Sequence, residues 1–127
     1  MIKIKPKIYI VDDDESIRRA LSRLMKSTGY EAETFDSAQL FLDSVPPDTQ
    51  GILILDIRMP DIDGFELQRR LNVSRSKLRI IFITAHAQAG DRERAMKAGA
   101  KGFLQKPFNE TSLLDLINSI SIEKDKR

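Results

Sequence analysis

The sequence predicts an α/β protein, a doubly wound parallel sheet with helices on both of its faces. Five short apolar runs alternate along the chain with five amphipathic segments, and this alternation is typical of parallel strands connected by helices. The runs at 52–55 and 80–83 are apolar throughout, as expected for central strands that are buried on both faces. With 127 residues and no repeat or linker, the chain 1–127 is expected to form a single domain with an ordered core at about 7–122.

The strands are expected at 8–11, 31–35, 52–55, 80–83 and 102–105. The run at 31–35 is the weakest of the five and is expected at an edge of the sheet. The helices are expected at about 17–25, 38–45, 63–71, 89–98 and 113–120, where apolar residues recur at helical spacing. Side chains that can cap their first turns precede four of them, namely Asp13 or Asp14, Asp36 or Ser37, Asp63, and Asn109. Their ends are marked by Gly29, Pro46-Pro47 and Gly99.

The composition excludes several classes of protein. Cysteine is absent, which excludes a disulfide framework and a thiolate metal site. No apolar run approaches the length of a membrane span, and residues 1–7 lack the apolar stretch of a signal peptide. We therefore expect a cytoplasmic protein with no membrane contact.

The charge distribution argues against direct nucleic-acid binding, although the sequence pI is about 9.0. The formal net charge is only +2, and six basic and two acidic residues lie in the two ends, at 3–7 and 123–127. Without those ends, 15 of the 21 basic residues and 17 of the 19 acidic residues remain. The central part is thus slightly acidic and lacks the basic stripe that binds phosphate backbones.

Four of the predicted strands end at residues with charged or reactive side chains. Asp12 and Asp13 follow the first strand and Asp56 follows the third. Thr84 follows the fourth strand and Lys106 the fifth. Ligands of open α/β sheets bind outside the carboxyl ends of the strands, so these five side chains are expected in one pocket.

The chemistry of that pocket favours phosphoryl transfer. Three carboxylates repel each other and stay ionised together only when a cation joins them. Oxygen ligands without His or Cys select a hard ion such as Mg²⁺, with Asp13 and Asp56 as direct ligands and Asp12 acting through water. Asp56 follows a fully apolar strand and is the best nucleophile candidate, because carboxylates can accept phosphoryl groups. Lys106 and Thr84 would add the counter-charge and positioning that phosphoryl transfer needs.

The motifs at these positions resemble, along the whole chain, the receiver domain of two-component response regulators. The matching motifs are Val11-Asp12-Asp13, Leu55-Asp56-Ile57-Arg58-Met59-Pro60 with Asp63-Gly64, Thr84-Ala85, and Lys106-Pro107-Phe108. Met59-Pro60, residues 95–100 and Phe103 are most similar to the FixJ subfamily, whose receivers usually precede a DNA-binding helix-turn-helix domain. The resemblance implies a flavodoxin-like (βα)5 fold with strand order 2-1-3-4-5.

The resemblance also implies a role for each site residue. Asp56 would accept phosphate from a cognate histidine kinase, with Mg²⁺, or Mn²⁺ in its place, as cofactor. Asp12, Asp13 and Asp56 would hold the ion together with the backbone carbonyl of Arg58, and Thr84 and Lys106 would contact the phosphoryl group. The module would catalyse only its own phosphorylation and dephosphorylation, so it is not expected to be an enzyme with a metabolic substrate.

Further implications concern the switch and the output. Thr84 and Phe103 would be the switch residues, with Phe103 in place of the tyrosine of many members. The resemblance implies a cis Lys106–Pro107 bond. The signal would be read on the fourth helix, fifth strand and fifth helix, through phosphorylation-dependent homodimerisation and, in a longer regulator with a C-terminal DNA-binding domain, transcription. Arg58 and His86, two residues after Asp56 and Thr84, are expected to tune dephosphorylation.

Each of these residues also has a simpler interpretation. Asp13 and its two acidic neighbours could only cap a helix and complement its dipole. Lys106 alone would be an ordinary surface lysine, and Thr84 alone could end a strand. His86 is the only histidine and is expected in a loop, and Phe103 could be plain core. The functional prediction therefore depends on finding all of these residues together at the ends of four predicted strands.

Three other functions compete with the receiver hypothesis. A metal-dependent phosphatase with an aspartyl nucleophile typically carries a second acid two residues after the nucleophile, where this chain has Arg58. A flavin or nucleotide carrier needs a glycine-rich phosphate loop after the first strand, where this chain has four consecutive acids at 12–15. A pure interaction scaffold would leave the five-residue set unexplained.

Overall fold

The computed structural model describes residues 5–125, and it contains one parallel sheet of five strands. The strands are β1 (Ile8–Val11), β2 (Ala32–Phe35), β3 (Gln50–Leu55), β4 (Lys77–Thr84) and β5 (Gly102–Gln105). They pair in the order β2-β1-β3-β4-β5, and every neighbouring pair is parallel. The predicted fold class and strand order are confirmed, with β2 at an edge.

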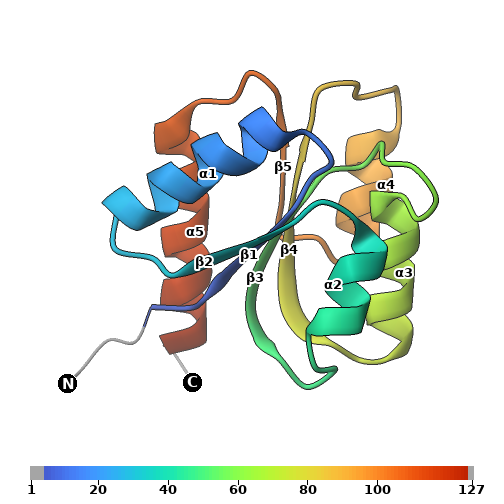
Figure 1. The fold of residues 1–127 in the computed structure, drawn as a ribbon, viewed down its shortest axis with the longest axis horizontal. Helices are drawn as coiled ribbons and strands as arrows, with labels where there is room; N and C mark the ends of the chain where they lie inside the picture. Colours follow the sequence, from blue (N-terminus) through green and yellow to red (C-terminus); the bar gives the residue numbers. More distant parts are fainter. Residues whose placement is uncertain (1–4, 126–127) are drawn as a thin grey trace.

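The helices cover both faces of the sheet, as the alternating pattern predicts (Figure 1). One face carries α1 (Glu15–Ser27) and α5 (Glu110–Asp125). The other face carries α2 (Ala38–Ser44), α3 (Gly64–Val73) and α4 (Asp91–Lys97). None of the helices within residues 5–125 has the length and apolar content needed to cross a membrane.

Two apolar cores hold the layers together, because successive residues of a strand point to opposite faces of the sheet. Ile8 and Ile10 of β1 point to the α1–α5 face, whereas Tyr9 and Val11 point to the α2–α3–α4 face. The first core also contains Leu21, Met25, Leu113 and Ile117 from the two helices. The second core also contains Phe35, Phe41, Phe65, Leu67, Phe82 and Ala95. Both cores sit below the carboxyl edge of the sheet and fix the strand ends that carry the site.

Several element boundaries differ from the sequence prediction by a few residues, and two of these differences have identifiable reasons. β4 begins at Lys77, three residues before the predicted Ile80, because its polar start pairs with the start of β3. The fourth helix begins at Asp91 instead of residue 89. Gly90 has a φ of 87°, which is left-handed backbone that cannot continue into a right-handed helix.

Side-chain caps fix the chain where it leaves β1 and β3. Asp14, one of the two predicted caps of the first helix, accepts the backbone N–H groups of Ser16 and Ile17. Asp63 caps α3 as predicted and accepts the N–H of Glu66. Because these caps close the loops after β1 and β3, they hold the segments that carry the acidic residues.

Candidate functional site

Three carboxylates gather at the carboxyl edge of the sheet. We call Asp12, Asp13 and Asp56 the acidic cluster; one oxygen of each lies within 4.8 Å of the others. The Lys106 ammonium lies 2.8 Å from Asp12 Oδ2 and 3.9 Å from Asp56 Oδ1. Asp12 and Asp56 are buried, with 2% and 6% of their surface exposed, whereas Asp13 is exposed. The structure thus brings together four of the five residues that the strand ends predict.

Asp12 is held in place by main-chain and side-chain contacts. Its Oδ1 accepts the N–H of Asp14 at 2.9 Å, and its backbone carbonyl accepts a hydrogen bond from Arg18 at 2.8 Å. Its own N–H donates to the Phe35 carbonyl on β2. These contacts therefore hold the Asp12 carboxylate in a fixed position beside Lys106.

Asp56 lies at the start of the loop 56–63, which we call the acceptor loop. Its N–H donates to the Val11 carbonyl, and its Oδ1 accepts the N–H of Ile57 at 2.9 Å. Gly64 then packs directly against this turn, and its N–H donates to the Ile57 carbonyl at 2.8 Å. A Cβ at Gly64 would lie 2.2 Å from the Asp56 carbonyl oxygen, so only glycine fits there.

Gly64 and Arg18 are two site residues that the sequence analysis did not assign. Gly64 belongs to one of the quoted motifs, and a glycine at the first position of a helix is an unusual choice that signals close backbone approach. Arg18 has no such signal, because a basic residue in the first turns of a helix is ordinary.

Burial and charge repulsion raise the pKa of Asp56 to about 6. Loss of solvation is the largest cause, the Asp12 charge adds to it, and Lys106 opposes it. Loss of solvation also raises the pKa of Asp12, although its hydrogen bond with Lys106 opposes this. One ammonium thus compensates only part of the charge of three carboxylates, and the site favours a further cation.

The donor set fits a hard divalent cation. All three side chains of the acidic cluster offer oxygen, their oxygens are close enough to share one ion, and Asp13 faces solvent. Such ligands suit Mg²⁺, which binds through one or two carboxylates and keeps several waters. The backbone carbonyl of Arg58 as a further ligand stays a prediction.

Thr84 and Phe103 lie on adjacent strands, β4 and β5. The Thr84 side chain is fully buried, and its Oγ1 accepts the N–H of His86 at 3.4 Å. The Thr84 carbonyl accepts the N–H of Lys106, which ties the ends of β4 and β5 together. Phe103 is 8% exposed and packs against Phe82, with ring centroids 6.4 Å apart. Phe103 is therefore a core residue here, and its role as a switch stays a prediction.

The other predicted positions lie around the rim. His86 is exposed in the loop after β4, as expected. The Lys106–Pro107 bond is cis, as the resemblance implies. The Arg58 side chain forms an ion pair with Asp91 at the start of α4. Asp91 could not be identified from the sequence, because no motif links it to the acceptor loop.

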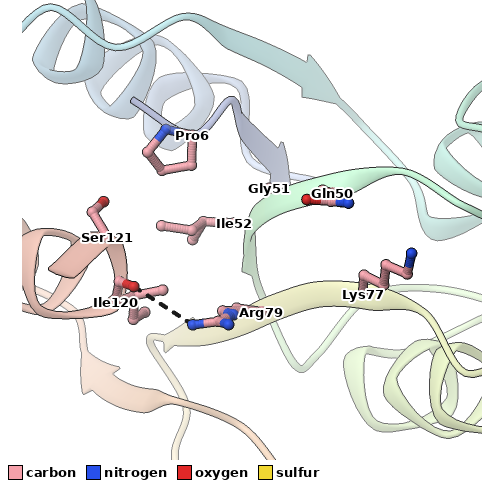
Figure 2. Close-up of a pocket in the computed structure, with 8 residues that line it drawn as sticks. All are labelled: Pro6, Gln50, Gly51, Ile52, Lys77, Arg79, Ile120 and Ser121. Carbon is pink, nitrogen blue, oxygen red and sulfur yellow. Dashed lines mark hydrogen bonds between the residues drawn. The ribbon is translucent and has the colours of Figure 1, made fainter. Parts of the chain in front are cut away.

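A cavity of about 460 Å³ lies at the opposite edge of the sheet (Figure 2). Its lining comes from the starts of β3 and β4 and from the α5 residues Ile120 and Ser121. Arg79 crosses it to donate to the Ile120 carbonyl. Because these are the amino ends of the strands, the cavity is separate from the acidic cluster.

Comparison with known proteins identifies the family of this chain. The model of the response regulator receiver domain family matches residues 8–118. The response regulator protein TodT of Pseudomonas putida is 44% identical over 112 residues, which are 88% of this chain and 49% of TodT. The transcriptional regulatory protein FixJ of Bradyrhizobium diazoefficiens is 40% identical over 115 residues, which are 91% of this chain and 56% of FixJ. The chain thus spans about half the length of these curated relatives.

A solved structure of the response regulator StyR superimposes with a TM-score of 0.86 at 45% identity, and the match covers 97% of this chain and 64% of that one. Sequence and fold therefore agree over almost the whole chain. The chain belongs to the receiver domains of response regulators, the phosphoacceptor modules of two-component systems.

Proposed function

We propose that Asp56 is the phosphoacceptor of this receiver and that Lys106, Thr84 and a metal ion at the acidic cluster promote the transfer. The observation that supports this is the placement of a buried carboxylate, Asp56, beside the partly buried Lys106 ammonium at the carboxyl edge of the sheet. Asp12 is already paired with Lys106, and Asp13 is exposed, so Asp56 is the member of the cluster best suited to be the nucleophile.

In the transfer, one carboxylate oxygen of Asp56 forms a bond to phosphorus while the bond from phosphorus to the donor breaks. With a histidine kinase the leaving group is the kinase's histidine nitrogen, and with acetyl phosphate it is acetate. Lys106 neutralises charge on the phosphoryl oxygens, and Thr84 donates its hydroxyl to one of them. The backbone contacts of Asp56 with Val11 and Ile57 keep the carboxylate in position throughout.

Asp12, Asp13, Asp56 and the Arg58 carbonyl would hold Mg²⁺, or Mn²⁺ in its place. When bound, the ion supplies positive charge that neutralises the phosphoryl oxygens. This chain's own residues favour the ion because burial and, after it, the Asp12 charge disfavour the ionised form of Asp56 and raise its pKa to about 6; a cation offsets both effects.

The physiological donor is a cognate histidine kinase, and the output is transcription through a DNA-binding domain of a longer regulator. This output is supported by the similarity to FixJ, which is a transcriptional regulatory protein. The matched region is about half of FixJ, so the rest of that protein has no counterpart in this chain. Phosphate on Asp56 draws the Thr84 hydroxyl inward and lets Phe103 rotate, which changes the α4–β5–α5 face and favours a homodimer. Such a switch requires the phosphoryl group to interact more strongly with the active state.

The proposed acceptor is tested with acetyl phosphate and Mg²⁺, followed by intact-mass measurement. One phosphoryl group should add to the wild type and none to Asp56→Asn. Asp48→Asn makes the same change of charge at an exposed residue before β3 and should behave as the wild type. Equal labelling of the Asp56→Asn variant would refute the assignment, and loss of labelling in EDTA would support the metal.

A further inference from the structure

An ion pair between Arg58 and Asp91 joins the acceptor loop to α4. Arg58 Nη2 lies 2.5 Å from Asp91 Oδ2, and the two side chains are 32% and 10% exposed. The same Asp91 oxygen accepts the N–H of Gln88 at 2.8 Å. One carboxylate oxygen therefore holds both the guanidinium and the loop that precedes α4.

The guanidinium is only partly satisfied in this position. Arg58 Nε is buried and has no hydrogen-bond partner among the residues that the structure describes. A guanidinium has five N–H donors, and a buried donor without a partner is unfavourable. Arg58 thus keeps donor capacity that an additional anion nearby would use.

A phosphoryl group on Asp56 would be such an anion. Arg58 follows Asp56 by two residues, so their Cα atoms are at most about 7 Å apart, well within the reach of an arginine side chain. A phosphoryl group carries up to two negative charges and three acceptor oxygens, and guanidinium groups bind it through two parallel hydrogen bonds.

We propose that Asp91 is a positioning residue for the phosphoryl chemistry: it holds the Arg58 guanidinium on α4, and the phosphoryl group on Asp56 competes with it for that guanidinium. The proposal rests on the proposed role of Asp56 as the acceptor. It gives the acceptor loop a direct, charge-dependent connection to the start of α4.

The contacts at the other end of α4 differ from the Arg58–Asp91 pair, because they do not depend on charge. The Gln68 side chain on α3 donates to the Ala95 carbonyl at 3.0 Å, and Asn72 donates to the Ala98 carbonyl at 2.9 Å. Both are neutral contacts that a phosphoryl group does not compete for. Departure of Arg58 therefore removes the contact between the acceptor loop and the start of α4. Asp91 keeps its hydrogen bond with Gln88, Arg92 keeps its hydrogen bond to the Phe103 carbonyl on β5, and the end of the helix stays on α3.

The same competition sets the lifetime of the phosphoryl group. In hydrolysis, a water oxygen forms a bond to phosphorus as the bond to the Asp56 oxygen breaks, which leaves inorganic phosphate, the Asp56 carboxylate and a proton released to solvent. A guanidinium over the phosphoryl group occupies the space from which that water attacks. Asp91 holds Arg58 away and therefore shortens the lifetime.

A double-mutant cycle tests this role. Wild type, Asp91→Asn, Arg58→Ala and the double variant are phosphorylated with acetyl phosphate and Mg²⁺, the donor is removed, and decay is followed by intact mass. Asp91→Asn should slow decay about fivefold when Arg58 is present and leave it unchanged in the Arg58→Ala background. Asp91→Glu, which restores the charge, should bring decay back toward the wild-type rate, and the control Asp48→Asn should not change it.

A spectroscopic measurement tests the pair without phosphorylation. The Arg58 Nε–H resonance, assigned by its loss in Arg58→Ala, should shift in unphosphorylated Asp91→Asn and should shift in the wild type when Asp56 is phosphorylated. An effect of Asp91→Asn on decay that is the same in both Arg58 backgrounds, or a resonance that does not move, would overturn this proposal alone. Failure of the wild type to take up phosphate would overturn the proposed function and this proposal with it.

Discussion

Replacement of Asp56 by Asn should stabilise the fold at neutral pH when no divalent ion is present. The carboxylate is 6% exposed, and its pKa is raised from 3.8 to about 6 by loss of solvation and by the Asp12 charge. The charged form is therefore disfavoured in the folded protein relative to the unfolded chain. Asn keeps the size of the side chain and an oxygen that can accept the Ile57 N–H, while it removes the charge.

The magnitude follows from the two pKa values. A difference from 3.8 to about 6 corresponds to about 3 kcal/mol of lost stability once Asp56 is ionised in both states. Between these values the folded protein binds more protons than the unfolded chain, so the wild type loses stability as pH rises from about 4 to about 6. Asp56→Asn should thus be more stable by up to about 3 kcal/mol at pH 7.5, and this advantage should shrink by roughly 2 kcal/mol at pH 4.

Urea denaturation of both proteins in EDTA, at several pH values between 4 and 7.5, measures this difference. The other titratable groups are common to the two proteins, so the difference in the free energy of unfolding reports on Asp56 and on its interaction with Asp12. Mg²⁺ should stabilise the wild type more than the Asn variant, because it offsets the repulsion in the acidic cluster. An Asn variant that is less stable than the wild type at pH 7.5, or a stability difference that does not depend on pH, would refute the electrostatic reasoning.

Two further predictions follow from the same geometry. Gly64→Ala should lower the free energy of unfolding by about 1–3 kcal/mol and slow phosphoryl uptake, because the added Cβ would meet the Asp56 carbonyl oxygen. Gly99→Ala is the control for uptake: its φ of 102° makes it lose stability too, but its Cβ meets nothing within 4 Å, so it should keep the wild-type rate of uptake. The affinity for Mg²⁺, measured by calorimetry, should fall by up to about tenfold per pH unit below pH 6, since protons compete for Asp56; a constant affinity from pH 7.5 to pH 5 would contradict the raised pKa.

The strand ends show how far the sequence determines the site. Asp12, Asp56 and Lys106 could be predicted to meet because each directly follows a predicted strand, and parallel strands end at one edge of the sheet. The ion pair between Arg58 and Asp91 could not be predicted, because both residues lie beyond the strands. Loop backbone conformation, such as the left-handed Gly90 before α4, sets their approach, and no periodic pattern encodes it.

The Asp12 and Asp56 carboxylates show how the site depends on the buried strands that carry it. Both are buried at the ends of β1 and β3, and burial disfavours the ionised form of each. The fold tolerates this because the strands beneath are enclosed by two apolar cores. The burial and the charge repulsion that disfavour the ionised carboxylates also strengthen their interaction with a cation, and the cation in turn permits a phosphoryl group beside them. The unfavourable burial of these two charges therefore favours binding of the ligands on which the receiver's chemistry depends.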